Sequence, residues 1–578
     1  MLAVLTAAAA MIMIFPAVSI STEGAAGDIA NEIYFGGYGG DCFISVIPTT
    51  DGGFVAVGDS GEDSFGKASW KGVAGKGGDD AIIVKFKADM TVEWAKNFGG
   101  TMDDCFYDVT EAPDGGYVAV GCSYLFDGDW AAYGVTGRGH DDSIIVKFNS
   151  NGSVAWAKNF GGSSTDQFFS VTTVPDGYIA VGDAVELDGD WAANGIMNKW
   201  GTPIVKFNLD GSVAWAKNFG GTNWDVLNSV IAVPDGFVAV GFSTGFDKDW
   251  GGRGITGKGD KDATIIKFDN SGSVVWAKNF GGSGEDVFES VIAVPDGFVA
   301  VGYSNKFNKD WTAKGVSGKG SYDATIVKFD NDGSVVWAKN FGGSRSDSFL
   351  SVTAVSGGFV AVGSSEKGSF SNGDWMTGED SSEPWLINAI MVRFNNEGIA
   401  DMKKGFSEVV NSELTSVTVA PDGYIAAGFF YATVFNAAEK EWKTDIDAAI
   451  MKIDHGAISV TKISGIPASV DVGTDVTLTG TVVPSDASKK TITWALKDAG
   501  TTEATLTDGV LSTAAAGTVV VTATIADGTA AGDYVKDFTI TVKEPDNSSS
   551  LLWIGMIAVI GIILIGAAAF FIKKKMAP

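Results

Sequence analysis

Internal repetition is the feature that most constrains what this chain can fold into. A string of the type Val-Ala-Val-Gly recurs roughly every 60 residues. Its seven copies end at Gly58, Gly121, Gly182, Gly241, Gly302, Gly363 and Gly428. Such self-similarity indicates a solenoid, a propeller or another array, because each copy is one supersecondary unit that buries its apolar faces against its neighbours.

Two further strings divide every repeat in the same way. One is of the Ile-Val-Lys-Phe type, and it ends at Phe86, Phe148, Phe207, Phe268, Phe329, Phe394 and Ile453. The other is Trp-Ala-Lys-Asn-Phe-Gly-Gly, and it starts at Trp94, Trp156, Trp215, Trp276 and Trp337. The repeat is therefore larger than one hairpin.

The repeat at residues 280–341 is representative. After a short alternating strand, a Pro-Asp-Gly turn at 295–297 leads into the apolar run 298–302, which predicts a hairpin. A loop of about 20 residues precedes a third strand at 324–329, and a fourth strand follows at 334–340. Four antiparallel strands in each of seven repeats fit a seven-bladed β-propeller, so we predict an all-β fold.

We expect the propeller to occupy residues 29–457. Its seventh blade lacks a fourth strand, and two segments could supply one, Asn31–Gly37 and Ile458–Ser464. We favour Asn31–Gly37, because pairing the first residues with the last blade removes two open sheet edges.

Composition and charge argue against nucleic acid as a partner. The chain has 578 residues, with 77 Gly, 36 Phe and only 13 Pro, which suits many short strands joined by tight turns. The net charge is −29. An acidic surface repels phosphate backbones, so we expect no nucleic acid among the partners.

The two ends predict membrane targeting. Residues 551–572 form an uncharged apolar run, long enough to span a bilayer as a helix, and the lysines of the tail 573–578 mark its cytoplasmic side. Residues 1–20 resemble a signal peptide, although no basic residue precedes Lys67, and an uncleaved signal anchor is the alternative. We therefore expect a single-pass protein of the cell membrane with an extracellular N-terminal part.

The repeats resemble the propeller repeats of prokaryotic secreted and cell-surface proteins. The resemblance lies in Phe-Gly-Gly-Ser-Gly-Glu-Asp, Pro-Asp-Gly-Phe-Val-Ala-Val-Gly and Asp-Gly-Ser-Val-Val-Trp-Ala-Lys-Asn, and it concerns architecture rather than ligand. The spacing Asp-x-x-Gly-x-x-x-Trp from Asp330 to Trp337 is similar to that of quinoprotein-type repeats. That similarity implies that Trp94 and its four equivalents dock between blades, and it implies no quinone cofactor.

Residues 458–544 have a different character. Short alternating phrases such as Gly517–Ala523 resemble a group 2 bacterial immunoglobulin-like domain, in which Trp494 would be the core tryptophan. A single copy departs from the usual tandem arrangement. The polar residues 545–550 are expected to be a linker to the transmembrane helix.

The long loop between the second and third strands of each repeat carries a tryptophan: Trp70, Trp130, Trp191, Trp250, Trp311, Trp375 and Trp442. Binding residues often lie on loops of a rigid scaffold. We therefore consider ligand stacking on five of them, Trp130, Trp191, Trp250, Trp311 and Trp375. The alternative is that these rings fold down and cover the blade core.

Acidic residues form two repeated sets. The first is a set of Asp-x-Asp pairs just before the loop tryptophans, which could bind Ca²⁺ together with backbone oxygens or could simply form Asx turns. These residues are Asp127, Asp129, Asp188, Asp190, Asp247 and Asp249. The second set opens the first strands around the axis, where its members could together attract a cation but are expected to cap local turns; it comprises Asp41, Asp104, Asp166, Asp225, Asp286 and Asp347, with Ser412 in the seventh place.

The three cysteines are too few for a disulfide framework. Cys42 and Cys105 occupy equivalent places in the first two repeats, and Cys122 lies across the predicted hairpin from Cys105. A Cys105–Cys122 bridge is sterically conceivable, and burial as small apolar side chains is the alternative.

Catalytic motifs are missing. There are two histidines, and no zinc-hydrolase motif or nucleophile elbow occurs, so we expect no enzymatic activity. The sequence favours a surface protein that presents a propeller for adhesion to, or recognition of, a glycan or protein ligand. The alternatives are a structural component of the cell envelope and a hydrolase or lyase that acts on polysaccharide.

Overall fold

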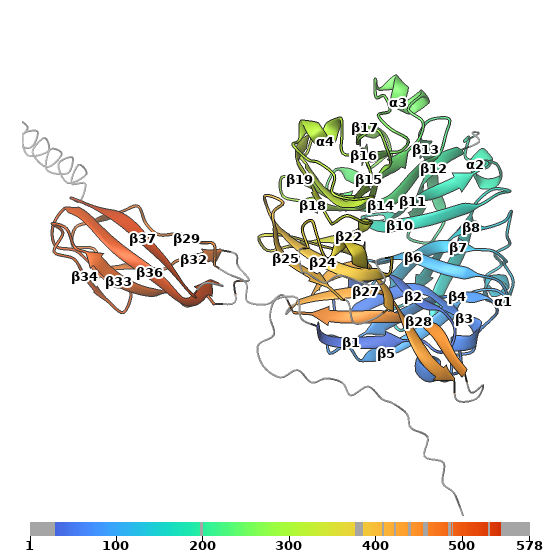
Figure 1. Cartoon of the computed structure of the whole chain (residues 1–578), viewed down its shortest axis with the longest axis horizontal. Coiled ribbons are helices and arrows are strands. Elements are labelled where there is room, and N and C mark those ends of the chain that lie inside the picture. The colour runs from blue at the N-terminus through green and yellow to red at the C-terminus, as the bar shows by residue number, and fades with distance from the viewer. Residues whose placement is uncertain are drawn as a thin grey trace, which may run out of the picture. The chain divides into compact units, whose positions relative to one another are not determined.

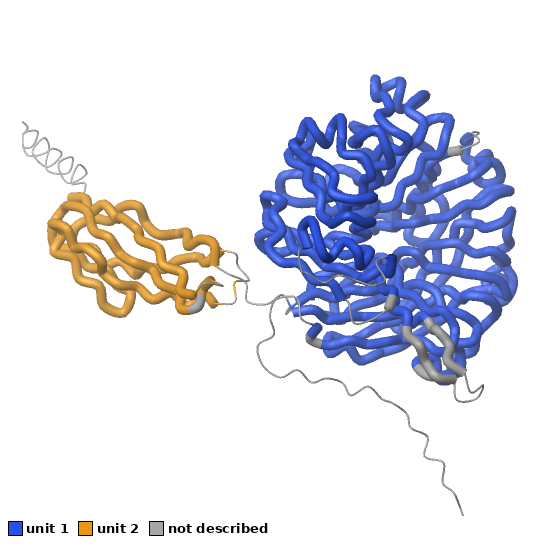
Figure 2. Tube along the Cα trace, viewed as in Figure 1, with its two compact units in different colours: residues 1–456 blue, residues 457–578 orange. Residues whose placement is uncertain are grey.

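A computed structural model describes most of the chain as two compact units. The described residues are 29–196, 200–375, 385–406, 410–420, 423–436, 441–454, 460–483, 487, 489–529 and 532–544. The first unit is Met1–Gly456 and the second is Ala457–Pro578 (Figure 2).

The first unit contains seven four-stranded antiparallel sheets (Figure 1). Blades 1 to 3 comprise β2 (Asp41–Pro48), β3 (Phe54–Gly61), β4 (Asp79–Phe86), β5 (Val92–Phe98), β6 (Asp104–Glu111), β7 (Tyr117–Ser123), β8 (Asp142–Phe148), β9 (Val154–Phe160), β10 (Asp166–Val174), β11 (Gly177–Val185), β12 (Trp200–Asn208) and β13 (Val213–Phe219). Blades 4 to 6 comprise β14 (Asp225–Val233), β15 (Gly236–Ser243), β16 (Asp262–Asp269), β17 (Val274–Phe280), β18 (Asp286–Val294), β19 (Gly297–Ser304), β20 (Asp323–Phe329), β21 (Val335–Phe341), β22 (Asp347–Val355), β23 (Gly358–Glu366), β24 (Ile387–Asn395) and β25 (Ala400–Gly405). Blade 7 comprises β26 (Val410–Ala420), β27 (Gly423–Asn436), β28 (Glu441–Ile453) and β1 (Ile29–Phe35).

Short helices interrupt the loops between second and third strands. They are η1 (Glu62–Ser64), η2 (Ala68–Trp70), α1 (Gly128–Ala132), α2 (Gly189–Ala193), α3 (Lys248–Gly252), α4 (Asp310–Ala313) and η3 (Lys367–Ser369).

The seven sheets form a closed ring. The first strand of every blade contacts the first strand of the next, and β26 of blade 7 contacts β2 of blade 1. At this closure the Val46 amide donates to Ser416 Oγ over 3.1 Å, and Thr415 Oγ1 donates to the Phe43 carbonyl over 2.8 Å. The predicted β-propeller is therefore confirmed, with the first strands around its axis.

The N-terminal strand completes blade 7, as predicted. β1 pairs antiparallel with β28, and Phe35 lies opposite Ala448. The other candidate segment, 458–464, contributes no strand to this sheet. Two sheet edges that would otherwise lie open are thereby paired with each other.

The Val-Ala-Val-Gly string has a physical explanation in the second strands. Both faces of such a strand are covered by neighbouring blades, and Val299, Ala300 and Val301 are fully buried. The glycine lies beside a β-bulge in the first strand; a Cβ on Gly121 would be 1.9 Å from the Cys105 carbonyl oxygen. Any larger residue there would displace the bulge.

The tryptophans of the fourth strands dock between blades. Trp94 in blade 1 donates its Nε1 hydrogen to the Ser150 carbonyl in blade 2 over 3.0 Å. A Cβ on Gly152 in the same turn would be 2.8 Å from the Trp94 ring, so only glycine lets the turn lie against it. The docking role implied by the Asp-x-x-Gly-x-x-x-Trp spacing is therefore confirmed.

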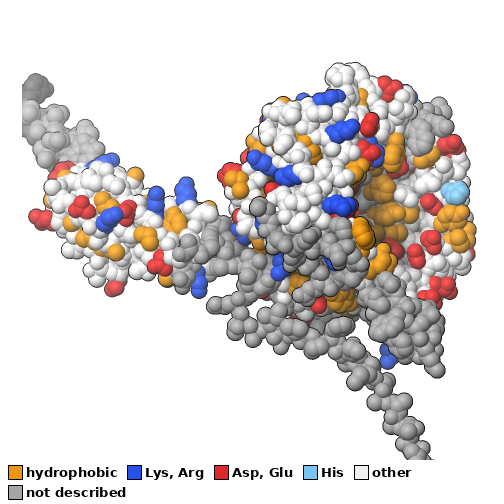
Figure 3. Space-filling view, viewed as in Figure 1, with side chains coloured by type: hydrophobic (Ala, Val, Ile, Leu, Met, Phe, Trp, Pro, Cys, Tyr) orange, Lys and Arg blue, Asp and Glu red, His pale blue; other side chains and the backbone are white. Residues whose placement is uncertain are grey.

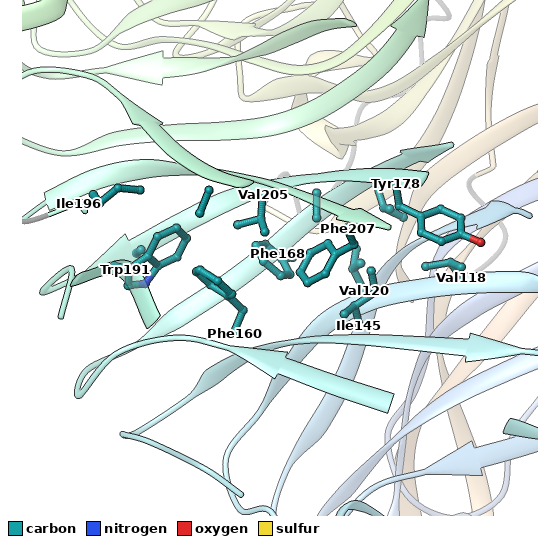
Figure 4. Close-up of a cluster of buried hydrophobic side chains, with 14 of the residues drawn as sticks. Val118, Val120, Ile145, Phe160, Phe168, Tyr178, Trp191, Ile196, Val205 and Phe207 are labelled. Carbon is teal, nitrogen blue, oxygen red and sulfur yellow. The ribbon is translucent and has the colours of Figure 1, made fainter. Parts of the chain in front are cut away.

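The hydrophobic core consists of one cluster between each pair of blades. Between blades 2 and 3, Phe160 packs edge-on against Trp191 with ring centroids 4.5 Å apart, and Phe168 and Phe207 continue the cluster toward Val120 (Figure 4). Edge-to-face aromatic contacts of this kind stabilise a core beyond their buried area.

The second unit is also all-β. Its strands are β29 (Lys462–Ser464), β30 (Ser469–Asp471), β31 (Val476–Thr477), β32 (Thr481–Val483), β33 (Thr493–Asp498), β34 (Thr505–Thr507), β35 (Val510–Ser512), β36 (Gly517–Thr529) and β37 (Gly532–Lys543). A sheet in the order β30-β37-β36-β33 and a sheet in the order β31-β35-β34 share one apolar core around Leu511 and Val521. Trp494 is half-buried and packs against this core.

The predicted targeting segments 1–20 and 551–572, the linker 545–550 and the tail 573–578 lie outside the described residues. Among the residues that the structure does describe, no helix has the length and apolar character needed to cross a membrane.

Candidate functional site: the mouth of the axial channel

The loop tryptophans are buried, which corrects the interpretation that they stack on a ligand. Trp130, Trp191, Trp250, Trp311 and Trp375 expose between 0% and 2% of their surface. Trp70 is equally buried, and the side chain of Trp442 lies outside the described part. A ring with no exposed face cannot contact a ligand, so the alternative, that these rings cover the blade core, holds for the six that are described.

Five of the buried tryptophans belong to a repeated contact between blades, which we call the tryptophan clamp. In blade 2, Trp130 Nε1 donates to Asp104 Oδ1 over 3.0 Å, and the ring packs edge-on against Phe98 of blade 1 with centroids 4.6 Å apart. The other Asp104 oxygen accepts the Gly100 amide at 2.7 Å. A Cβ on Gly99 would be 2.4 Å from this carboxylate, which explains the Gly-Gly pair. The same tryptophan–aspartate bond recurs at Trp191–Asp166, Trp250–Asp225, Trp311–Asp286 and Trp375–Asp347.

The aspartates of these clamps are buried and accept backbone amides, as the Gly100 amide shows. This agrees with the interpretation that they cap local turns. Burial raises the pKa of Asp104 and Asp166 to about 7. Burial likewise raises the pKa of Asp225, Asp286 and Asp347 to about 6, and it raises that of Asp41. Removal from water disfavours the charged carboxylate, and the donated hydrogen bonds only partly offset this cost.

These pKa values predict a pH dependence of stability. The folded chain holds the protons of Asp104 and Asp166 more tightly than the unfolded chain, whose aspartates titrate near 4. Stability therefore falls as pH rises from about 4 to about 7. We expect the Tm of the full chain to drop by several degrees between pH 5 and pH 8.

Thermal melts followed by tryptophan fluorescence check this prediction. Repeating them at high salt gives the control, because salt screens repulsion between surface carboxylates and hardly affects the desolvation of buried ones. A Tm that rises from pH 5 to pH 8, or a drop that vanishes in salt, would contradict the assignment to the clamp aspartates.

The Asp-x-Asp pairs fasten the loops and are not brought together as a metal site. Asp127 accepts the Thr101 amide at 2.7 Å, and Asp129 accepts the Gly99 amide at 3.3 Å and pairs with Lys76 of blade 1 at 3.0 Å. Equivalent bonds engage the other four residues, Asp188, Asp190, Asp247 and Asp249. Within the described ranges no group of three or more acidic, histidine or cysteine side chains is placed to hold a metal ion. The geometry therefore gives no support to calcium binding at these loops.

The blades differ at the end of the axial channel where the first strands begin, which we call the mouth. Here the residue after the opening aspartate of each first strand, or after Ser412 in blade 7, lies opposite the residue after the recurring glycine of the second strand. These seven mouth pairs are Cys42–Asp59, Cys105–Cys122, Gln167–Asp183, Val226–Phe242, Val287–Tyr303, Ser348–Ser364 and Glu413–Phe429. No two pairs are the same, although the strands on either side repeat closely.

Side chains of neighbouring mouth pairs contact one another. Cys105 Sγ lies 3.4 Å from Asp59 Oδ1, and Gln167 Nε2 lies 3.7 Å from Cys122 Sγ. On the other side of the ring, Ser364 Oγ donates to Glu413 Oε1 over 3.1 Å. The mouth pairs therefore form a connected lining whose chemistry changes from blade to blade.

One sector of the mouth, over blades 4 and 5, is aromatic. Trp224 is 43% exposed, packs edge-on against Phe242 with centroids 5.0 Å apart, and donates to Asp183 over 3.2 Å. The Lys261 ammonium lies 5.3 Å from the Trp224 ring centroid. In the space-filling view hydrophobic side chains line a hollow of the propeller (Figure 3). This sector offers aromatic faces to solvent, as the clamp tryptophans do not.

A pocket of about 250 Å³ adjoins the aromatic sector between blades 5 and 6. Its lining comprises Glu285, Tyr303, Tyr322, Ser346, Asp347, Ser348, Ser364, Glu366 and Ile387. The rings of Tyr303 and Tyr322 meet edge-on with centroids 5.6 Å apart. A concave site with aromatic walls and a few polar groups is the usual form of a small-molecule site.

Carboxyl groups with perturbed pKa values lie at the mouth and on a first strand next to it. Burial, and next the nearby Glu413 carboxylate, raise the pKa of Glu289 to about 7. Asn228 Nδ2 donates to Glu289 over 3.0 Å. Burial also raises the pKa of Glu413, and in blade 1 burial and then Asp79 raise the pKa of Asp59 to about 7. Clustering of perturbed carboxyls in a channel is typical of functional sites.

The three cysteines gather at the mouth as free thiols. Cys105 and Cys122 are direct cross-strand partners, and Tyr107 Oη lies 3.5 Å from Cys122 Sγ. Burial raises the pKa of Cys122 to about 12 and that of Cys42 and Cys105 well above the usual range. Thiols this hard to ionise are poor nucleophiles, so they act here as half-buried lining side chains.

Sequence reasoning looked for the candidate site among the loop tryptophans and the Asp-x-Asp pairs. It selected residues that recur in all blades, and these proved to hold the blades together. The signal for the mouth was present in the repeats themselves, because Trp224, Phe242 and Tyr303 stand where other repeats have unrelated residues.

Comparisons with known proteins give little beyond the fold. No family model matches the chain. The chain is 24% identical to the regulatory protein FlaEY of Caulobacter vibrioides over 231 residues, which are 38% of this chain and 24% of that protein. The chain thus matches about a quarter of the length of this curated relative.

Two solved structures are similar at a low level. A neuraminidase-like protein of A/flat-faced bat/Peru has 9% identity and a TM-score of 0.32, covering 59% of this chain and 85% of that one. A mutant apocarotenoid oxygenase of Synechocystis has 9% identity and a TM-score of 0.30, covering 75% of this chain and 95% of that one. Both values are too low to bear on activity or ligand.

Proposed function

We propose that this protein is a cell-surface recognition module that binds a glycan or protein ligand at the mouth of its propeller, without catalysis. The observation that carries the proposal is the divergence of the mouth pairs within an otherwise repeating scaffold. A structural need common to all blades selects the same residue in each, as at the tryptophan clamps. The mouth pairs differ from blade to blade and therefore meet no such common need, and selection by a ligand would explain their difference.

The second unit and the chain ends support presentation at a membrane. Two sheets around a shared core suit the immunoglobulin-like sandwich that the sequence of 458–544 resembles. Residues 551–572 have the length and apolarity of a membrane-spanning helix, followed by lysines. We propose that the propeller is held outside the cell on this unit and anchored by that helix.

A second candidate, polysaccharide cleavage, has one observation in its favour. Glu289 and Glu413 are two carboxyl groups of the channel whose charges interact, and the pKa of Glu289 is raised to about 7. Most glycosidases act with a pair of carboxyl groups, of which the general acid has a raised pKa. Release of reducing ends from polysaccharide by the full chain, abolished by Glu289→Gln, would favour this candidate.

Binding assays test the recognition proposal. We expect the full chain, immobilised through its C-terminus, to bind members of a panel of glycans and cell-envelope proteins. Trp224→Ala, at the exposed ring of the aromatic sector of the mouth, is expected to weaken that binding at least about tenfold, a loss of about 1.4 kcal/mol. Val275→Ala is a matched control, because Val275 is a 53% exposed apolar residue on the outer strand of the same blade. Equal effects of the two substitutions, or unchanged binding in both, would contradict a site at the mouth.

A further inference from the structure

We propose that the pocket between blades 5 and 6 binds one uncharged sugar residue. The pocket is lined by Glu285, Tyr303, Tyr322, Ser348 and Glu366 among others, and its volume is about 250 Å³. This inference rests on the proposed function, since it names the ligand class of one part of the mouth.

The charges of the pocket favour a neutral ligand. Glu285 pairs with Lys261 at 3.6 Å, and Glu366 pairs with Arg345 at 3.9 Å. A site that binds a cation offers carboxylates that have no basic partner in the protein. A site that binds an anion offers basic groups that have no acidic partner. The two glutamates of the lining each have an opposite charge beside them, and its third carboxyl group, Asp347, is buried in a tryptophan clamp, so a ligand that carries net charge gains no complementary partner.

The polar groups of the pocket favour a ligand with many hydroxyl groups. Ser348 Oγ and Ser364 Oγ lie 3.1 Å apart, and Ser364 in turn donates to Glu413. Tyr322 Oη donates to Glu285 over 3.3 Å. Serine and tyrosine hydroxyls both donate and accept, and carboxylates accept. Sugar hydroxyls likewise do both, so each can replace water at these groups with two matched hydrogen bonds.

The aromatic walls and the size of the pocket favour a single sugar ring. The edge-on contact of Tyr303 with Tyr322 holds the two rings at 79° to each other, which orients their faces. Both rings are half-buried, so each is fixed in place and still accessible. The apolar C–H face of a pyranose packs on such a ring, and a monosaccharide fills the available volume. Tyr303 and Tyr322 thus supply the apolar contact, while Glu285 and the serines supply orientation.

Isothermal titration of the full chain tests the inference. The detergent must have a head group without sugar, because a glycoside detergent would compete. We expect at least one of glucose, galactose, mannose and N-acetylglucosamine to bind with a Kd of about 1 mM, as suits a ligand of this size. Glucosamine and glucuronate, which add a positive and a negative charge, are expected to bind at least about threefold more weakly than the neutral parent.

Variants locate the binding. Tyr322→Ala is expected to weaken binding of the sugar at least about tenfold, whereas Tyr322→Phe keeps the ring and is expected to lose about threefold or less. Tyr124→Ala is the matched control, because Tyr124 is a 41% exposed tyrosine of blade 2 that packs on His140. Unchanged thermal melting of each variant shows that the propeller is intact.

The outcomes separate this inference from the proposed function. Sugar binding that Trp224→Ala abolishes and Tyr322→Ala leaves intact would overturn the pocket and keep the mouth as the site. Preference for the charged sugars would overturn the neutral ligand. Absence of binding to every sugar of the panel would overturn the inference as well, while a protein ligand that Trp224→Ala releases would still support the proposed function.

Discussion

Deletion of residues 29–37 should lower the Tm of the propeller by roughly 10 °C. The deleted segment contains β1, whose Phe35 is 2% exposed and packs edge-on against Trp70 with centroids 4.8 Å apart. Loss of one buried phenylalanine alone costs about 3–5 kcal/mol. The deletion also leaves β28 as an unpaired edge in blade 7 and removes its seam with blade 1.

Differential scanning calorimetry of the full chain measures this effect, and the deleted chain should also aggregate on heating. Phe35→Ala is expected to give a smaller loss than the deletion, because the strand pairing remains. Asn31→Ala, at an exposed position of the same strand, is expected to change the Tm by less than about 1 °C. An unchanged melting curve after the deletion would show that β1 does not close the ring.

Trp250→Ala is the second change with a large expected effect. Trp250 is 1% exposed, packs edge-on against Phe219 of the preceding blade with centroids 4.7 Å apart, and donates to Asp225 over 3.1 Å. Truncation should cost about 3–5 kcal/mol, and the loss of the Nε1 donor leaves the buried Asp225 oxygen without this partner. We expect the free energy of unfolding, measured with urea, to fall by at least this amount.

Trp224→Ala is the matched control for that experiment. It removes the same side chain from the same blade, but at a site that is 43% exposed. We expect a loss of less than about 1 kcal/mol. A destabilisation equal to that of Trp250→Ala would mean that the mouth, too, is part of the scaffold, and this would weaken the proposed function.

The fold was largely predictable because its causes are local and recur. The alternating strands and the glycine beside each bulge occur in every repeat, Pro-Asp-Gly turns occur in five of the seven, and the segment 31–37 repeats the end of a fourth strand. Even the docking of Trp276 followed from its spacing to the turn glycine Gly272. In each case a short stretch of sequence determines a contact that the structure repeats.

The candidate site was not predictable in the same way. Whether a loop tryptophan is buried depends on a partner in the preceding blade, as Trp130 depends on Phe98, and no local pattern shows that contact. The mouth brings together residues such as Asp59 and Cys105, or Ser364 and Glu413, which are far apart along the chain. Which residues of the first and second strands lie opposite each other depends on the bulges in the first strands.

The tryptophan clamps have a consequence for how such a molecule can change. Because every clamp joins adjacent blades through the same tryptophan, aspartate and Gly-Gly turn, one unit can be exchanged for another without altering the seams on either side. Duplication and exchange of repeats would therefore change the residues that line the channel and leave the contacts between blades intact. A chain built in this way could acquire a new binding preference by replacing a single module of about 60 residues.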